Sequence, residues 1–258
     1  MVNQNSPSSR QTIQENAASL GMMSSNLSGQ TVVVTGASRR IGASICRSFA
    51  ESGADVIIHC NSSLRDAENL ANEIGAEVVQ GDLVEPETDQ RILSAVQNYG
   101  NGLFCLVHSA SIFVTDEGPT ADLMTAVNHE APRRLTELLM SELRSARGSV
   151  ISITDACKKR SAAYSKYDES KDSLRRWTLQ FALDQAPEIR ANCIAPGAII
   201  PAPEEEEIVD SLAAKIPLSR WGQADDISRA VLFFATSPYI TAQELMVDGG
   251  WSAAMNQD

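Results

Sequence analysis

The sequence has no uninterrupted run of eighteen apolar residues, although hydrophobic residues make up 43% of its 258 positions. A helix needs a segment of about that length to span a bilayer, so we expect no membrane insertion. Basic residues are also few, with 21 lysines and arginines against 33 acidic residues and a net charge of −12. This balance opposes general attraction to nucleic acid or to an anionic membrane, so any anion must be bound by a local site.

Paired cysteines and closely spaced histidines are missing as well. The five cysteines include no C-x-x-C pair, and His59, His108 and His129 lack the spacing of metal ligands. We therefore expect reduced thiols, a cytoplasmic protein and no metal site. The cysteines are Cys46, Cys60, Cys105, Cys157 and Cys193.

Residues 1–28 are rich in Ser, Asn and Gln and have neither a basic start nor a sustained apolar stretch. They are predicted to form a flexible N-terminal arm rather than a secretory signal, followed by one large domain over residues 29–258. Within that domain, residues 198–223 break the regular pattern with prolines and four consecutive glutamates. Two interpretations are open for this segment: a lid over a substrate site, or a solvated acidic helix start.

From Thr31 onward, short β-branched runs alternate with amphipathic segments, a pattern typical of βαβ units. It predicts a single-domain, doubly wound parallel α/β sheet of about seven strands with helices on both faces. The strand candidates are TVVVTG, ADVIIHC, AEVVQGD, LFCLVHSAS, GSVISIT, RANCIAPG and ELMVDGG, and helices are expected near residues 41–52, 64–74, 86–99, 120–144, 163–184 and 225–236.

The first strand runs into VVVTGASRRIGASI, where a turn separates an apolar strand from an amphipathic helix. Gly36 permits a tight turn, and Gly42 lets the helix pack close to the strand. The N–H groups at the start of the helix, together with Ser38, would face a pyrophosphate. This stretch therefore predicts a dinucleotide-binding turn.

The same turn resembles the T-G-x-x-x-G-x-G motif of the short-chain dehydrogenase/reductase family, with Arg40 at the middle glycine position. The resemblance extends over residues 31–250, through YDESK, CIAPGAI and VDGGW. An arginine at position 40 resembles the pteridine reductase branch of that family. The resemblance implies a Rossmann-type fold and a homotetramer or homodimer built on the helices expected at 120–144 and 163–184.

HCNSS follows the second strand, where NAD enzymes usually carry an acid for the adenosine ribose. The next carboxylate comes only at Asp66, so a 2′-phosphate would meet hydrogen-bond donors and Arg39. We predict NADPH/NADP+ as the cofactor, although Arg39 and Arg40 could also be solvated arginines at a helix start. The predicted cofactor residues, several of them implied by the resemblance alone, are Gly36, Ser38, Arg39, Arg40, Ile41, Asn61, Ser62, Ser63, Asp82, Leu83, Ser109, Ala110, Ser111, Tyr167, Lys171, Pro196 and Gly197.

The stretch YDESK supplies the candidate proton donor. Tyr167 and Lys171 lie one helical turn apart on the same face, and a neighbouring ammonium lowers the pKa of a tyrosine by stabilising its phenolate. The resemblance adds Asn128 as the residue that relays water to the lysine. Tyr164 is a rival acid, but Asp168 stands where its lysine partner would be.

Either Asp155 or Thr154 occupies the place of the family's substrate-binding serine. An ionised aspartate cannot donate to a carbonyl oxygen, but it accepts from N–H groups and orients a proton donor, which favours a pterin over a ketone. Asp155 could alternatively be only a turn residue at the strand end. Phe113 either stacks on a flat heterocycle or packs in the core. The predicted substrate-binding residues are Arg40, Ser111, Phe113, Asp155 and Tyr167.

Three hypotheses follow for the function. The first is an NADPH-dependent, pteridine reductase-like enzyme that reduces a C=N bond of a pterin or dihydrofolate. The second is a generalist NADPH-dependent carbonyl reductase, favoured if Thr154 faces the site. The third is a non-catalytic NADPH-binding sensor, because HSAS (residues 108–111) departs from the family's N-N-A-G stretch at three of four positions.

Overall fold

The computed structural model describes residues 26–157, 161–201 and 209–255. Within these ranges, seven strands form one parallel sheet in the order β3-β2-β1-β4-β5-β6-β7, which confirms the predicted fold class. The strands are β1 (Thr31–Val34), β2 (Asp55–Cys60), β3 (Glu77–Gln80), β4 (Cys105–His108), β5 (Ser149–Ile153), β6 (Arg190–Pro196) and β7 (Glu244–Val247).

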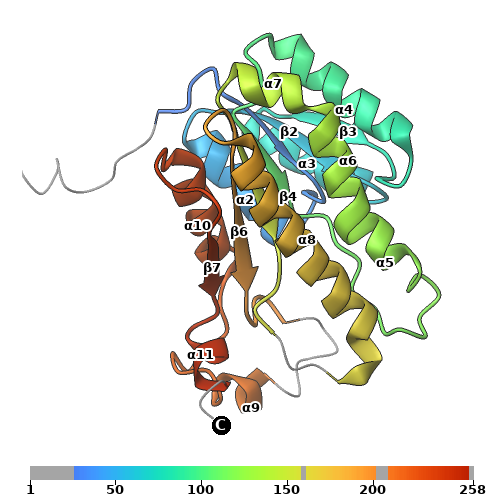
Figure 1. Ribbon diagram of the computed structural model, residues 1–258, viewed down its shortest axis with the longest axis vertical. Helices are drawn as coiled ribbons and strands as arrows, with labels where there is room; N and C mark the ends of the chain where they lie inside the picture. Colours follow the sequence, from blue (N-terminus) through green and yellow to red (C-terminus); the bar gives the residue numbers. More distant parts are fainter. Residues whose placement is uncertain (1–25, 158–160, 202–208, 256–258) are drawn as a thin grey trace, which may run out of the picture.

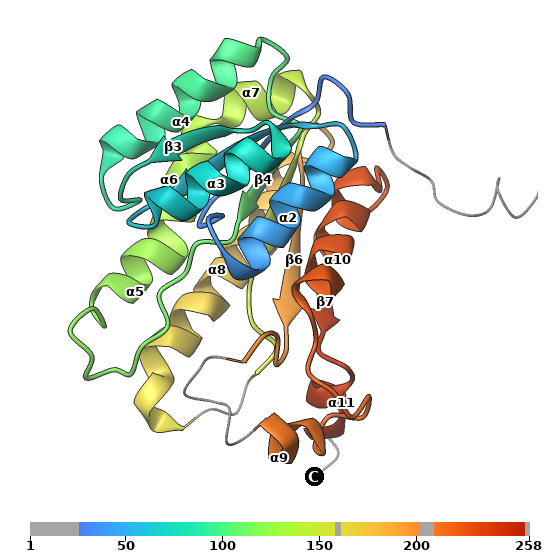
Figure 2. The same ribbon diagram turned by 180° about the vertical axis from the view of Figure 1, so that it is seen from behind.

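Helices cover both faces of this sheet. In Figure 1, α4, α6 and α8 lie in front of the strands, and Figure 2 shows α2, α3 and α10 on the opposite face. The helices are α2 (Arg40–Glu51), α3 (Leu64–Ile74), α4 (Pro86–Tyr99), α5 (Leu123–Thr125), α6 (Ala131–Leu138), α7 (Met140–Ser145), α8 (Ser165–Gln185), α9 (Val209–Ala213), α10 (Ala224–Thr236) and α11 (Trp251–Met255), with a π-helical turn over Ala126–Glu130 and a 3-10 turn over Ala162–Tyr164.

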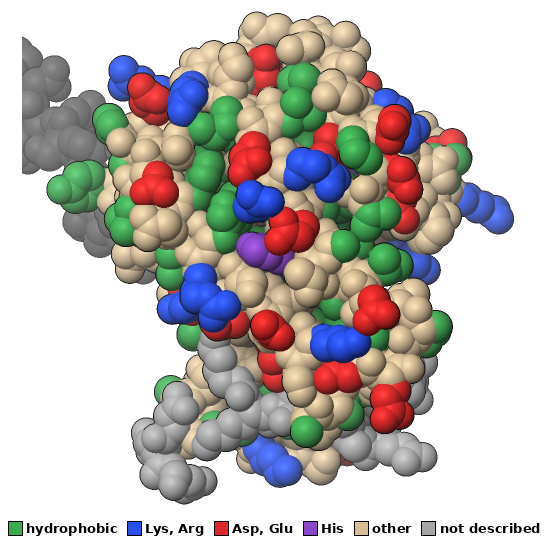
Figure 3. Space-filling view, turned by 45° about the vertical axis from the view of Figure 1, so that its right-hand side comes forward, with side chains coloured by type: hydrophobic (Ala, Val, Ile, Leu, Met, Phe, Trp, Pro, Cys, Tyr) green, Lys and Arg blue, Asp and Glu red, His purple; other side chains and the backbone are tan. Residues whose placement is uncertain are grey.

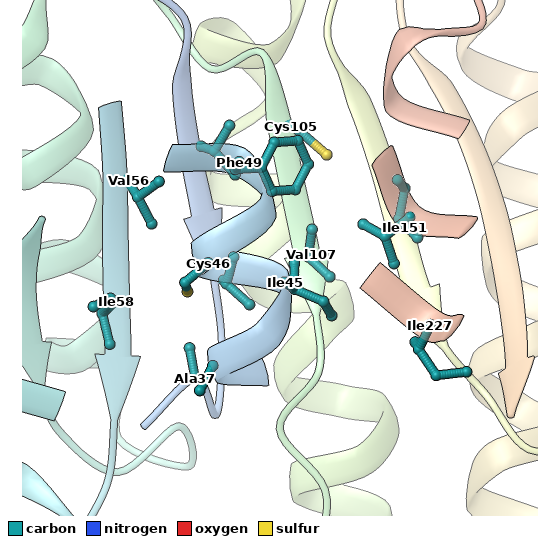
Figure 4. Packing of buried hydrophobic residues seen from close by; sticks show 14 of the residues in the cluster. Ala37, Ile45, Cys46, Phe49, Val56, Ile58, Cys105, Val107, Ile151 and Ile227 are labelled. Carbon is teal, nitrogen blue, oxygen red and sulfur yellow. The ribbon is translucent and has the colours of Figure 1, made fainter. Parts of the chain in front are cut away.

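The first helix, α2, packs its apolar side on the sheet, as expected of the amphipathic segment near residues 41–52. Ile45 and Phe49 are fully buried and project from α2 toward Cys105 and Val107 of β4 (Figure 4). Burial of each such side chain contributes about 2 kcal/mol to folding. A Cβ at Gly42 would come within 2.6 Å of the Gly36 carbonyl oxygen, so the glycine lets α2 begin directly against the end of β1.

The prediction of a single helix over residues 120–144 was wrong. The chain instead forms α5, the π-helical turn, α6 and α7. Asn128 lies in the π-helical turn, where its side chain accepts the Ile112 N–H at 2.8 Å and donates to the Ile112 carbonyl at 2.9 Å. These two bonds stabilise the wider turn. The sequence did not predict this turn, because one extra residue is not detected by the apolar periodicity alone.

Most of the predicted N-terminal arm, residues 1–25, lies outside the described residues. Leu27 is only 5% exposed and packs in the main core, and its N–H donates to the Ser52 carbonyl at 2.8 Å. The boundary predicted at residue 28 is therefore too late, because the domain already includes Leu27. None of the helices that the structure describes has both the length and the apolar character needed to cross a bilayer.

Candidate active site

A cleft of about 1190 Å³ opens beside the carboxyl ends of the strands, around the point where the strand order reverses between β1 and β4. Open parallel sheets bind their ligands at this point. All of the residues predicted for the cofactor line this cleft, and so do all of those predicted for the substrate. Asn128 is fully buried and is not among the residues that line it.

The turn after β1 is held rigidly against the end of β4. Gly36 has a φ of +62°, and a Cβ there would come within 2.5 Å of the Ala110 Cα. The buried hydroxyl of Thr35 accepts the N–H groups of Ser109 and Ala110 at 3.1 and 3.2 Å. Residue 109 is therefore positioned by its backbone N–H, and this contact does not depend on the identity of its side chain.

The N-terminus of α2 borders the same cleft through Arg40, Ile41 and Gly42. Among the described residues, no side chain caps this terminus, and no acid lies in its first turn. The first amides of a helix carry partial positive charge and need acceptors. The residues present thus fit a phosphate or pyrophosphate group, which supplies both oxygen acceptors and negative charge.

The two arginines of the turn make different contacts. Arg39 forms a 3.5 Å ion pair with Asp66 of α3, and both side chains are largely exposed. Such a pair contributes little stability and leaves the guanidinium beside the HCNSS stretch available to an anion. Arg40 has a φ of +52°, and its guanidinium donates to the carbonyl of Ile200. Arg40 thereby connects the turn after β1 to the start of the segment over residues 198–223.

That segment is anchored at both ends. Ile199 and Gly222 form an isolated parallel bridge, and the Gly222 N–H donates to the Ala198 carbonyl at 2.9 Å. Trp221 donates through its indole to the Val209 carbonyl at 3.1 Å. The glutamate run at residues 204–207 lies outside the described residues, so the choice between a lid and an acidic helix start stays open.

Asp155, Tyr167 and Lys171 meet where β5 ends and α8 begins. The Tyr167 hydroxyl donates to Asp155 Oδ2 at 3.0 Å, and the Lys171 ammonium lies 5.8 Å from the centre of the tyrosine ring. Lys171 also donates to the Ile153 carbonyl at 3.0 Å, which fixes its position. Asp155 Oδ1 accepts the Cys157 N–H at 2.7 Å. The one carboxylate therefore caps a turn and also faces the tyrosine.

Thr154, the rival of Asp155, uses its hydroxyl inside the protein. The Thr154 oxygen lies 3.1 Å from the Ile194 carbonyl and 3.0 Å from Glu244 Oε1. A hydroxyl has one proton, and both of these neighbours are acceptors for it. The Thr154 proton is therefore engaged before any substrate arrives, and Asp155 is the residue in contact with Tyr167.

Phe113 forms an aromatic wall with two tyrosines. It is 53% exposed, so the interpretation of Phe113 as a core residue was wrong. Its ring stacks on Tyr164 at 5.0 Å between centroids and meets Tyr167 edge-on at 4.7 Å. An exposed ring in this position offers a flat apolar surface beside the candidate proton donor.

His108, which stands where the family has an asparagine, does not reach the cleft. It is buried, and its Nε2 lies 2.8 Å from the hydroxyl of Thr136, which itself donates to the Pro132 carbonyl at 2.8 Å. Burial lowers the pKa of His108 to about 3. The side chain is therefore neutral at physiological pH and connects β4 to α6.

Sequence reasoning missed several residues that line the cleft, among them His59, Trp221 and Trp251. The only signal for Trp251 was its place after VDGG.

Asp248 accepts the N–H groups of Gly250 and Ser252 at 2.9 and 2.7 Å, which fixes the start of α11. Burial would raise the pKa of Asp248, but these hydrogen bonds outweigh it and lower that pKa below its usual value.

Three known proteins illustrate what the chain is similar to. A dihydromonapterin reductase from Klebsiella pneumoniae subsp. pneumoniae is 30% identical over 230 residues, which cover 85% of this chain and 95% of that protein. An L-fucose dehydrogenase from Mus musculus is 31% identical over 248 residues, covering 86% and 88%. The crystal structure of FolM alternative dihydrofolate reductase 1 from Brucella suis, in complex with NADP, is 33% identical, with a TM-score of 0.81 over 88% of this chain and 96% of that one.

The family model described as enoyl-(acyl carrier protein) reductase matches residues 36–252, from the glycine of the first turn to the start of α11. This span includes the cleft, the tyrosine–lysine pair and six of the seven strands that the structure describes. With its sheet order and this match, the chain belongs to the short-chain dehydrogenase/reductase family of oxidoreductases.

Proposed function

We propose that this protein is an NADPH-dependent, pteridine reductase-like enzyme that reduces a C=N bond of a pterin or dihydrofolate. The observation that carries the proposal is the contact between Asp155 and Tyr167. The carboxylate stands where a ketone reductase needs a donor for the substrate carbonyl, and an ionised carboxylate cannot donate. It can accept hydrogen bonds from the amino and ring N–H groups of a pterin, which a simple ketone lacks.

The proton in this reaction is assigned to Tyr167. Its hydroxyl is held at 3.0 Å from Asp155, and the Lys171 ammonium lies 5.8 Å from its ring. This positive charge favours the phenolate that remains after proton transfer. NADPH supplies the hydride when it is bound. Asn128 is proposed to support the water path to Lys171, and its side chain donates to Ser170 of the same helix α8 at 3.0 Å.

The cofactor assignment rests on the chemistry of the cleft. The turn after β2 presents Asn61, Ser62 and Ser63, with Arg39 beside them, and no carboxylate among these lining residues opposes a 2′-phosphate. The uncapped start of α2 suits the pyrophosphate. The NADP complex of the similar Brucella suis reductase supports the same choice.

The pterin assignment is supported by the aromatic wall and by the relatives. Phe113 and Tyr164 present stacked rings at the cleft, as a planar heterocycle would require. Two of the similar proteins are named as a dihydromonapterin reductase and an alternative dihydrofolate reductase. The similarity to an L-fucose dehydrogenase favours the second candidate, a generalist reductase of carbonyl groups.

One assay separates the two candidates. NADPH oxidation is followed with folate, dihydrofolate, biopterin, quinonoid dihydropterin and simple ketones as competing substrates. We expect kcat/KM for at least one pterin or folate to exceed that for every ketone by about 10²-fold, because Asp155 hydrogen-bonds only the former. Faster turnover of ketones would identify the generalist reductase, and binding of NADPH without turnover of any substrate would identify a sensor.

We also propose that the protein acts in the cytoplasm as a homodimer or homotetramer and binds neither nucleic acid nor membranes. Figure 3 shows acidic and basic side chains interspersed over one face rather than a field of one sign. For example, Arg133 of α6 pairs with Glu137 of the same helix at 3.4 Å and with Glu130 of the preceding π-helical turn at 2.9 Å. Light scattering of the full chain at several concentrations measures the oligomeric state directly.

A further inference from the structure

A buried histidine with no part in the proposed chemistry lies at the cofactor end of the cleft. His59, near the end of β2, is 1% exposed, and part of it lines the cleft. Its Nδ1 accepts the Gly36 N–H at 3.3 Å, and its Nε2 lies 2.9 Å from the Gly81 carbonyl oxygen. Its own carbonyl accepts the Ala37 N–H at 2.9 Å. One residue of β2 thus joins the turns that follow β1 and β3.

These contacts specify the charge and the tautomer of the ring. The Gly36 amide is a donor and needs a lone pair on Nδ1, whereas the Gly81 carbonyl is an acceptor and needs a proton on Nε2. The neutral ring with its proton on Nε2 satisfies both. A protonated ring would set an N–H of the imidazolium against the N–H of Gly36, and that bond would be lost.

The turns joined by His59 have little freedom to move independently. Gly36 is pressed against Ala110, and a Cβ at Gly81 would overlap the side chain of Thr88. The Gly81 N–H also donates to the Cys60 carbonyl at 2.9 Å. A change at His59 is therefore transmitted to two turns that line the cleft, the phosphate-facing turn at Gly36 and the turn at Asp82.

The surroundings of His59 favour the neutral ring. Burial lowers the pKa of His59 below its usual value, while the Gly81 carbonyl and the carboxylate of Asp82 oppose this shift and Arg91 on α4 adds to it. Asp82 and Arg91 are the charged groups that act on the ring from the elements packed against it. The ring is thus neutral near pH 7.

We infer that His59 is a positioning residue for the cofactor, which holds the turns at Gly36 and Gly81 in their binding arrangement only while its imidazole is neutral. The inference rests on the NADP(H) binding of the proposed function but not on the identity of the reducible substrate. Because binding favours the neutral form, the dissociation constant for NADP+ rises as the pH falls through the pKa of His59 in the free protein. The rise is up to about tenfold per pH unit.

The test is a direct titration of the full chain with NADP+ at pH values from 8 to 5. The wild type is compared with His59→Asn, whose side-chain oxygen accepts the Gly36 N–H without titrating, and with His108→Asn as the matched control for a buried histidine outside the cleft. The 2′-phosphate has a pKa of about 6 and contributes equally to all three proteins. The ratio of dissociation constants between proteins at each pH therefore isolates the histidine.

We expect His59→Asn to bind NADP+ a few-fold more weakly than the wild type at pH 8 and to lose less affinity toward pH 5, whereas His108→Asn follows the wild-type profile. At pH 8, His59→Asn should raise KM for NADPH and leave kcat at saturating NADPH unchanged, which separates positioning from general damage. Circular dichroism at each pH verifies folding, and His59→Gln replaces the asparagine variant if that variant does not fold.

If the dissociation constant for NADP+ rose equally with falling pH in the wild type and in His59→Asn, the inference would be overturned while the proposed function stayed intact. A wild-type protein that does not bind NADP+ at pH 8 would overturn the proposed cofactor and the inference together. Lower kcat with unchanged KM in His59→Asn would show that His59 acts on catalysis rather than on cofactor position.

Discussion

The two ends of the cleft are built in different ways. At the cofactor end, Thr35, Gly36 and His59 tie together turns that directly follow adjacent strands. At the substrate end, Phe113, Tyr164 and Trp251 line the cleft from three separate segments, and the rings of Phe113 and Tyr164 stack on each other. The comparison teaches that backbone geometry defines the first end and side-chain identity defines the second.

This difference determines what substitutions should do. Changes at the substrate end should alter turnover and substrate choice without affecting cofactor binding. Changes at the cofactor end should alter affinity for the dinucleotide and leave the chemistry intact. The four predictions that follow test this separation, from the largest expected effect to the smallest.

Tyr167→Phe should lower kcat for the reducible substrate by about 10² to 10⁴, because it removes the group assigned to proton transfer. The dissociation constant for NADP+ should stay close to the wild-type value. Tyr164→Phe is the matched control, since it keeps the ring stacked on Phe113 and should change kcat far less. Steady-state kinetics and cofactor titration measure both quantities, and full activity of Tyr167→Phe would refute the mechanism.

Asp155→Ser should exchange the substrate preference. It replaces an acceptor with a donor, so kcat/KM for pterins should fall by about 10² while ketone reduction increases. Asp155→Asn keeps an oxygen able to accept the Cys157 N–H and should lose pterin turnover without unfolding. An unchanged ratio of pterin to ketone turnover in Asp155→Ser would show that Asp155 has no role in specificity.

Arg39→Ala should raise KM for NADPH by about tenfold and leave KM for NADH unchanged, because the guanidinium is assigned to the 2′-phosphate. Arg65→Ala removes a nearby exposed arginine that does not line the cleft and serves as the control. An equal rise in KM for NADPH and for NADH in Arg39→Ala would place Arg39 at the pyrophosphate instead. The effect should weaken at high salt, where exposed charges are screened.

The smallest functional effect is expected for His108, which lies outside both ends of the cleft. Its folded pKa of about 3 lies below the reference value of 6.5, so its contribution to stability is present above pH 6.5 and is lost as the pH falls toward 3. His108→Asn should therefore lose less unfolding free energy than the wild type between pH 7 and pH 4. Urea denaturation at each pH measures the unfolding free energy. Equal losses in the wild type and in His108→Asn would contradict the low pKa assigned to His108.

The same contrast explains how much of the structure could be predicted from the sequence. The strands and the turn at Gly36 were predictable because β-branched runs and a glycine between a strand and a helix are local signals. The division of the helix at Asn128 was not predictable, because it depends on bonds to Ile112, which is distant along the chain. The burial of Leu27 depends likewise on contacts formed only in the folded domain.

Within the site, the pair of Tyr167 and Lys171 was predictable from its helical spacing. The choice between Thr154 and Asp155 was not predictable. Adjacent side chains at a strand end point in different directions, and the sequence does not say which of the two points toward Tyr167. His59 was also missed, because a lone histidine in an apolar run carries no sequence signal for two backbone partners on other loops.

Arg40 also has a consequence for how the protein would respond to selection. A side chain at a φ of +52° costs about 1 to 2 kcal/mol that glycine would not incur, yet glycine has no side-chain donor to hold the Ile200 carbonyl as Arg40 does. Glycine at position 40 would therefore make the fold more tolerant of heat while releasing the segment beside the substrate. A screen for thermal survival alone would recover glycine there, whereas a screen for turnover would restore the arginine.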